Sequence, residues 1–473
     1  MSENSWPEND SCNMSKSKSP WPGDPKISDL SELALDYPEG EGRRRKAALM
    51  LALIWSTTIA LHVFSVGFWA VCCLTTLMSM HWLRMIRASA LPIAAPLGLG
   101  LAEEEYPFVS LLVSAKNEAA VLGSLVKTLC QLDYPAARYE VWIVDDNSTD
   151  KTPDILAQLT QEYPQLHMLR RSGNVGGGKS GALNQVLPLT QGDIIGVFDA
   201  DAQVSSDLLC RVLPLFADDH LGAVQVRKQI ANANTNFWTR GQSAEMGLDL
   251  YLQQQRIAVG GIGELRGNGQ FVRRQALISC GGWNEATITD DLDLTFRLHL
   301  NHWDIGILPV PAVQEEGVTR ALALWHQRNR WAEGGYQRYL DYWPLIIRNR
   351  LGPRKTFDLL VFGLAQYVLP TAAVPDLVMA TARNQLPLLM PMTSVTMLLS
   401  LVGMWNGLER VRRADNLSTP VFLMFLQTLR GTLYTCHWFL VMACVTARMS
   451  IRPKRLKWVK TLRQDDYPVY LPE

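Results

Sequence analysis

The sequence of 473 residues lacks several features that would assign it to a common class. Its 45 basic and 45 acidic residues leave no net charge, so we expect no nucleic-acid partner. Its eight cysteines lack the paired spacing of a zinc site, and we interpret them as reduced thiols. Residues 1–46 are largely polar, which predicts a disordered cytoplasmic tail and no secretory signal.

Charged residues are also missing from Ala47 to Leu83, a stretch long enough to cross a bilayer twice. Basic residues flank it on both sides, and the positive-inside rule places both ends in the cytoplasm. The pattern therefore predicts a transmembrane hairpin over residues 47–87 that turns near His62–Gly67. A single long tilted helix is the alternative. Residues 88–106 read as a linker of small residues.

A second group of apolar segments predicts transmembrane helices within residues 357–447. Leu359–Pro375 and Asn384–Leu408 carry no charge and have basic residues at their outer ends, which predicts a second hairpin. The last block, Pro420–Ala447, is interrupted by an Arg-Gly pair. It fits either one crossing or a broken, re-entrant hairpin. Residues 448–473 form a basic tail.

Between these blocks, in residues 107–343, short apolar runs alternate with amphipathic stretches, which is typical of an α/β domain with a mostly parallel sheet. Several elements are predicted from this pattern: strands at Phe108–Ser114, Tyr139–Asp145, Asp193–Asp199, Gly222–Val226 and Ile305–Val310, and helices at Glu118–Gln131 and Thr152–Glu162. Ligands of such sheets bind beyond the carboxyl ends of the strands. Two acidic pairs, at 145–146 and at 199 and 201, fall there.

Asp199 and Asp201 follow a nearly continuous apolar run. Two carboxylates at this spacing can share one divalent cation through hard oxygen ligands, and the cation can hold a diphosphate. A loop cap or a solvated turn is the alternative for an isolated Asp-x-Asp. The pair predicts a site for Mg²⁺, or Mn²⁺, and a nucleotide sugar.

Residues Gly173–Ser180 match the phosphate-loop pattern G-x-x-x-x-G-K-[ST]. Glycines let the backbone approach a phosphate, and Lys179 can neutralise it. The preceding segment, His167–Arg171, is short and basic, unlike the apolar buried strand that a phosphate loop usually follows. We therefore favour Lys179 as part of another kind of nucleotide site, with an NTPase loop and a structural turn as alternatives.

Two further motifs have both a chemical and a structural interpretation. A carboxylate in Thr289-Asp290-Asp291 can act as a catalytic base, although Thr289 can equally cap the helix predicted from Leu292 to Leu300. Gln327–Trp331 lies in an amphipathic, aromatic-rich stretch at 319–343 that suits a helix at the membrane interface. There Arg330 either contacts lipid headgroups or faces a diphosphate.

Seven motifs occur in order between Pro107 and Trp343: Ala115-Lys116-Asn117-Glu118, Asp145-Asp146, Lys179–Asn184, Asp199-Ala-Asp201, Gly267-Asn268-Gly269, Thr289-Asp290-Asp291 and Gln327-x-x-Arg330-Trp331. This ordered set resembles the membrane-embedded family 2 glycosyltransferases, which include cellulose, chitin and hyaluronan synthases. The resemblance covers half of the chain, and the order of the motifs is more specific than any one of them.

The resemblance implies a GT-A domain with a mixed, mostly parallel sheet, flanked by transmembrane helices, and Asp291 as the general base. It also implies donor-binding roles: Asp145 and Asp146 at the uracil and ribose, Lys179 at the nucleotide, Asp199 with Asp201 at the diphosphate and its cation, and Gln327, Arg330 and Trp331 closing the site. Two positions depart from the pattern. Asp290 stands where many relatives have Glu, and the glycine loop before Lys179 is longer than usual.

The implied reaction is an inverting transfer of glucose from UDP-glucose to 1,2-diacylglycerol, which gives a precursor of membrane galactolipids. A cytoplasmic domain held at the bilayer can meet a water-soluble donor on one side and a lipid on the other. A processive polysaccharide synthase that uses a UDP-sugar is the first alternative. A nucleotide-driven transporter or sensor built on Gly173–Ser180 is the second. The sequence indicates no particular protein partner.

Overall fold

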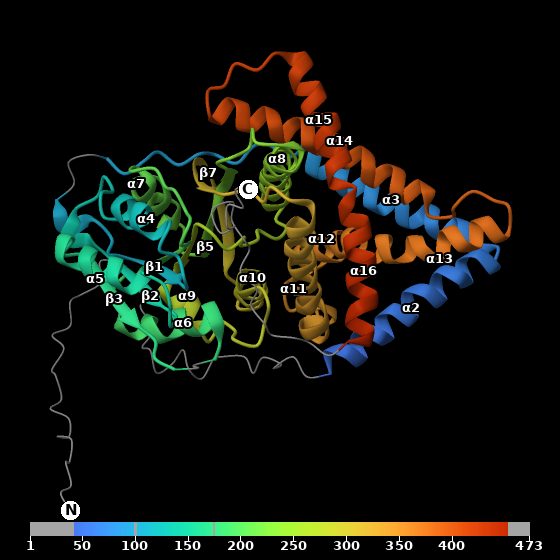
Figure 1. Ribbon diagram of the computed structural model, residues 1–473. Helices are drawn as coiled ribbons and strands as arrows, with labels where there is room; N and C mark the ends of the chain where they lie inside the picture. The colour runs from blue at the N-terminus through green and yellow to red at the C-terminus, as the bar shows by residue number, and fades with distance from the viewer. Residues whose placement is uncertain (1–41, 99–101, 174–175, 453–473) are drawn as a thin grey trace, which may run out of the picture.

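The computed structural model describes residues 42–98, 102–173 and 176–452. Most of the predicted N-terminal tail and of the basic C-terminal tail lies outside these residues. In Figure 1 an α/β domain occupies one side of the molecule and long helices occupy the other.

The α/β domain contains a seven-stranded sheet in the order β3-β2-β1-β4-β6-β5-β7. The strands are β1 (Val109–Ala115), β2 (Tyr139–Asp145), β3 (Leu166–Arg170), β4 (Ile194–Asp199), β5 (Leu221–Ile230), β6 (Gln270–Arg273) and β7 (Asp304–Glu315). All neighbours pair in parallel except β6, which is antiparallel to both β4 and β5. The predicted mixed, mostly parallel sheet is confirmed.

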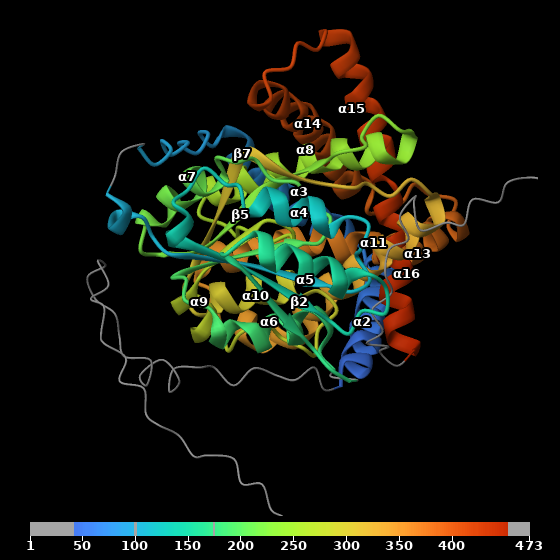
Figure 2. The ribbon, with the colours of Figure 1, turned by 60° about the vertical axis from the view of Figure 1, so that its left-hand side comes forward.

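Helices cover both faces of the sheet (Figure 2). The helices on one face are α4 (Leu122–Leu129), α5 (Thr152–Glu162) and α7 (Leu208–Val212), and those on the other are α6 (Gly178–Val186), α9 (Arg274–Ser279) and α10 (Asp290–Leu300). Both faces of the central strands β1 and β4 are covered, and nearly all of their side chains are buried. Strands in this position need mostly apolar residues on both faces. Strand β4 ends at Asp199, at the edge where the site forms.

Two strands were not predicted from the sequence. The short, basic segment before the glycine loop, which we did not assign to a strand, forms β3 at the edge of the sheet, where Leu166 is buried and Arg170 is exposed. An edge strand needs no continuous apolar run, because water solvates its outer side. Strand β6 has only four residues and follows the glycines of Gly267-Asn268-Gly269, so it is too short to show a period.

Within the described residues, three helices are long and apolar enough to cross a membrane: α2 (Arg43–Val63), α3 (Val66–Arg87) and the helix Pro353–Ala382. The first two are separated at Phe64 and Ser65, so the single long helix does not form. The third comprises α12 (Pro353–Gly363), the π-helical turn η5 (Leu364–Val368) and α13 (Leu369–Ala382).

The remaining long helices are α8 (Phe237–Ala258), α11 (Ala321–Ile347), α14 (Met390–Ala414), α15 (Val421–Thr435) and α16 (His437–Ile451). Helix α14, the expected second arm of the C-terminal hairpin, is not among the three long apolar helices. The last apolar block is broken at Cys436, not at its Arg-Gly pair. Helix α15 packs on α8 and α14, whereas α16 packs on α2 and α11.

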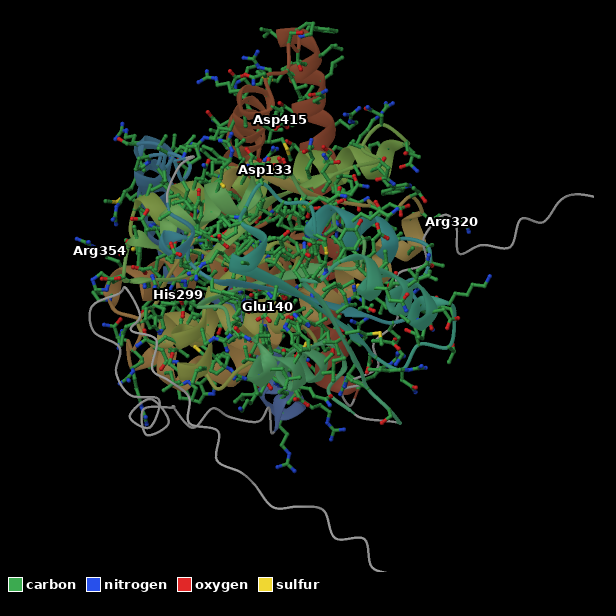
Figure 3. All side chains as sticks on the ribbon, turned by 90° about the vertical axis from the view of Figure 1, so that its left-hand side faces the viewer. Asp133, Glu140, His299, Arg320, Arg354 and Asp415 are labelled. Atoms are coloured by element: carbon green, nitrogen blue, oxygen red, sulfur yellow. The ribbon has the colours of Figure 1, made fainter. Side chains whose placement is uncertain are left out.

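Helix α14 attaches the helical part of the chain to the α/β domain. Asp415, which follows α14 and is labelled in Figure 3, accepts a 2.5 Å hydrogen bond from Arg227 on β5. Along the same helix, a Cβ added to Gly407 would collide with the carbonyl oxygen of Gly247 on α8. The two backbones can approach this closely because Gly407 has no side chain.

We expect Gly407→Ala to lower the unfolding midpoint of the purified chain by several degrees, because the new methyl group meets a backbone oxygen that cannot move aside. Gly403→Ala is the matched control on the same helix. Its methyl group meets the end of Leu248, with Cδ1 at 2.7 Å, and this side chain can rotate away. Equal losses of stability in the two variants would contradict the close packing of α8 and α14.

Candidate active site

A cavity of about 1020 Å³ lies between the carboxyl ends of the strands and the long helices. Polar residues from β4, the start of α10 and α11 line one part of it, among them Asp199, Asp291 and Arg330. Apolar residues from α3, α12, α14 and α16 line another part, among them Phe362 and Met397. One cavity therefore connects a charged region with an apolar region between helices.

The end of β4 supplies the carboxylates of the charged region. Asp199 accepts a 2.6 Å hydrogen bond from Lys179 Nζ, and Asp201 lines the cavity two residues further on. Burial alone would raise the pKa of Asp199, but the Lys179 ammonium holds it below its usual range. The backbone of Asp199 is fixed by Asn268, whose side-chain oxygen accepts from its N–H at 3.3 Å. This bond gives Gly267-Asn268-Gly269 a structural purpose.

The glycine loop before Lys179 is held by a buried arginine. Arg171 Nη2 donates to the carbonyl oxygen of Gly176 at 2.7 Å, and Nη1 donates to Gly178 and to Asp146 Oδ1. Helix α6 begins immediately afterwards at Gly178, so Lys179 lies in its first turn. The length of this loop therefore does not prevent Lys179 from reaching Asp199.

Asp290 and Asp291 open α10, and both line the cavity. Thr289 stands at the N-cap position, but its side chain makes no capping hydrogen bond, so helix capping does not account for the motif. Burial and the neighbouring charge of Asp290 raise the pKa of Asp291 to about 6. A carboxylate with this pKa is ionised at neutral pH and still basic enough to remove a proton.

Helix α11 brings Gln327, Arg330 and Trp331 to the cavity, as the motif predicts. The field of Arg330 reaches both Asp199 and Asp291, which places its guanidinium on the charged side. Gln327 Oε1 is buried without a hydrogen-bond partner. Its open position suits a ligand.

The two neighbouring carboxylates at the end of β2, Asp145 and Asp146, have different surroundings in the structure. Asp146 lines the cavity and pairs with Arg171 at 2.7 Å and with Lys116 at 3.3 Å. Asp145 is fully buried and does not line the cavity, and its Oδ1 accepts from the N–H of Ser148. Of the pair, the geometry brings Asp146 to the site and gives Asp145 a role in holding the turn.

Lys228 on β5 is a cavity residue that the sequence analysis missed. It forms a 2.9 Å ion pair with Glu315 on β7, and its Nζ lies 5.5 Å from the centre of the Trp331 ring. Burial would lower the pKa of Lys228, but Glu315, Asp199 and Asp291 keep it above the usual value. Its position at the carboxyl end of β5 follows the same rule that singled out Asp199.

The carboxylates fit a divalent cation that is completed by a substrate. Among residues 42–98, 102–173 and 176–452, no group of three or more acidic, His or Cys side chains could hold a metal ion. Mg²⁺ is commonly held by one or two carboxylates together with substrate phosphates. Asp199 and Asp201 match this donor set. The cationic groups of Lys179, Lys228 and Arg330 add positive charge for a diphosphate.

Paired carboxylates, a further carboxylate with a raised pKa and cationic side chains meet at the carboxyl edge of this sheet, an arrangement typical of a glycosyltransferase. Residues 110–281 match the family described as Glycosyl transferase family 2. The chain belongs to this family and is an enzyme of glycosyl transfer.

The similarity to relatives extends over nearly the whole chain. The chain is 60% identical over 473 residues to the beta-monoglucosyldiacylglycerol synthase of Nostoc sp. (strain PCC 7120), covering 98% of this chain and 99% of the relative. It is 59% identical over 425 residues to the enzyme of the same name from Synechocystis sp. (strain PCC 6803), covering 89% and 88%.

Among solved structures, the fold is similar to the mannosyltransferase PcManGT from Pyrobaculum calidifontis, which was determined in complex with GDP-Man and Mn²⁺. The TM-score is 0.52 at 20% identity, covering 82% of this chain and 99% of the other. This similarity confirms the GT-A fold.

We expect Asp291→Asn to reduce glycosyl transfer at least about a hundredfold without lowering stability. The folded-state pKa of about 6 lies above the ordinary 3.8, so the ionised carboxylate destabilises the fold progressively from pH 4 to 6 and fully above pH 6. At pH 7.5 the variant should therefore unfold at the same or a higher temperature. The wild-type rate should fall as the pH drops through about 6. A fully active variant would exclude Asp291 as the base.

Proposed function

We propose that this chain transfers glucose from UDP-glucose to the free hydroxyl of 1,2-diacylglycerol, with inversion, to give beta-monoglucosyldiacylglycerol, a precursor of membrane galactolipids. The observation that carries the proposal is the single cavity joining a charged region to an apolar region between helices. A water-soluble donor and a lipid acceptor require these two environments side by side. The names of the two relatives supply the sugar and the acceptor.

The reaction is a single displacement at the anomeric carbon. Asp291 removes the proton of the acceptor hydroxyl as its oxygen attacks, and the bond from the anomeric carbon to UDP breaks on the opposite face. Lys179 and Arg330 stabilise the negative charge that develops on the leaving diphosphate. Water must be kept from the anomeric carbon, and we assign this role to the half-buried Trp331, which lines the cavity from α11.

Donor recognition follows from the residues that reach the cavity. Asp146 is placed for the nucleoside, Lys179 for the nucleotide, and Gln327 and Trp331 for closing the site around the sugar. We retain Asp145 as a residue that supports the nucleoside site from behind, because it holds the turn that follows β2. Asp199 and Asp201 would hold Mg²⁺, or Mn²⁺, which supplies positive charge to the diphosphate when bound.

We propose that residues 107–343 form a cytoplasmic catalytic domain, with α2, α3 and the helix Pro353–Ala382 embedded in the bilayer. The basic residues around the first two helices support this orientation. By similarity to the relatives, the membrane is the plasma or thylakoid membrane of a cyanobacterium. A processive polysaccharide synthase is not favoured, because the relatives named above are glycolipid synthases.

In the direct test, membranes that contain the expressed chain are incubated with diacylglycerol and with labelled UDP-glucose or UDP-galactose. Each incubation contains either Mg²⁺ or EDTA. We expect one labelled product, a glycolipid with a single sugar, from UDP-glucose with the metal. EDTA should abolish its formation, and added Mg²⁺ or Mn²⁺ should restore it. A labelled polymer, or a product made equally well without the cation, would contradict the proposal. Asp291→Asn membranes are the matched control.

A further inference from the structure

The π-helical turn η5 interrupts the helix Pro353–Ala382 where it lines the cavity. Pro370 has no N–H to donate to the carbonyl oxygen of Gln366, four residues earlier, and its ring would clash with that oxygen in an α-helix. The wider turn Leu364–Val368 accommodates the proline. Single π turns often occur at functional sites because they redirect one side chain.

The π turn η5 lies close to the motif Thr289-Asp290-Asp291. Two adjacent glycines of α11 separate them: a Cβ on Gly334 would collide with Thr289, and a Cβ on Gly335 would collide with the hydroxyl of Tyr367. Tyr367 itself is buried and stacks on Tyr336, with ring centres 5.5 Å apart. The start of α10 and the π turn therefore pack closely against two adjacent residues of α11.

Gln366, next to Tyr367, lines the cavity with an open hydrogen-bonding position. Its Oε1 is buried and has no partner, and no hydrogen bond of its amide occurs within the described part of the chain. Rotation by 180° about the last side-chain torsion presents either Oε1 or Nε2 at the same place. The amide can therefore accept from or donate to a ligand.

Charged groups that line the same cavity as Gln366 form ion pairs with buried carboxylates. Arg256 pairs with Asp358 at 2.9 Å and with Glu264 at 3.3 Å, and Arg338 pairs with the same Glu264 at 3.3 Å. All four side chains are buried. A neutral amide beside these buried ion pairs suits a neutral polar group of a ligand.

Beyond Gln366 the cavity continues between helices, where its walls include Phe362, Met397, Leu399, Phe439 and Met442. These side chains come from α12, α14 and α16, and flexible Met side chains adapt to chains of varied shape. A glycerolipid joins polar ester groups to apolar acyl chains, and this cavity has walls of both kinds.

We infer that Gln366 anchors the acceptor: its amide Nε2 donates to an ester carbonyl of a neutral diacyl glycerolipid, while the acyl chains occupy the apolar part of the cavity. The lipid hydroxyl is then left for Asp291. This inference rests on the proposed function and adds to it a residue that selects ester-linked acceptors. Gln366 is a binding and positioning residue and takes no part in the proton transfer.

The test measures kinetics of the full chain in lipid nanodiscs for the wild type, Gln366→Met and Gln366→Asn. Met keeps the length of Gln without its hydrogen bond, so the KM for diacylglycerol should rise about twofold to tenfold while kcat and the KM for UDP-glucose stay unchanged. Gln366→Asn, a shorter amide, should give a smaller rise. If the Met variant fails to fold, the Asn variant carries the test. The matched control is Leu360→Met, on the exposed side of the same helix, which should change neither KM.

A dialkylglycerol, which has ether links in place of esters, distinguishes the loss of a hydrogen bond to the ester carbonyl from a general loss of packing around residue 366. It lacks the carbonyls, so the wild type should already show the raised KM, and Gln366→Met should raise it no further. An unchanged KM of both Gln366 variants for diacylglycerol, or an equal effect on both lipids, would overturn the inference while the proposed function stands. Wild-type protein that glucosylates no diacylglycerol would overturn the proposed function, and the inference with it.

Discussion

The close packing of α11 with the start of α10 and with the π turn η5 is the constraint on which the site depends. Gly334 and Gly335 have no side chains, so Thr289 and Tyr367 can approach adjacent positions of the helix. This brings Asp291, which we propose as the base, and the helices of the apolar region to one cavity. Any larger residue at these positions would push the catalytic motif away from the path that we propose for the lipid.

Electrostatics explains why a buried cavity can contain so many charges. Lys179 is balanced by Asp199 and Lys228 by Glu315, so these two cations of the diphosphate region already have carboxylate partners. A donor with its cation brings further charge of both signs and can exchange these pairings. Asp291, in contrast, has burial and a like charge around it, which leaves it basic. The same cavity thus contains paired charges and one carboxylate, Asp291, whose raised pKa suits the proton transfer that we propose.

The sequence predicts the parts of this arrangement that depend on local pattern. The buried strand that ends in Asp199 is visible as an apolar run, and the order of the motifs indicates the fold. The sequence did not indicate Lys228, because β5 continues beyond the apolar stretch that predicted it. A single charged residue within a strand does not alter a periodic pattern in a recognisable way. The burial of Asp145 depends on the turn that follows β2, and the role of Gln366 depends on Pro370 and on helices distant in sequence. These features arise from tertiary packing, which local pattern does not report.

The central claim is that one cavity receives both substrates, and labelling with a photoreactive diacylglycerol tests it most directly. The probe carries a diazirine on an acyl chain, and labelled peptides are mapped with and without excess unlabelled diacylglycerol. We predict labelling at Phe362, Met397 and Met442 that the unlabelled lipid prevents. Labelling confined to outward-facing residues such as Leu360 and Leu398, and unaffected by competitor, would contradict the claim.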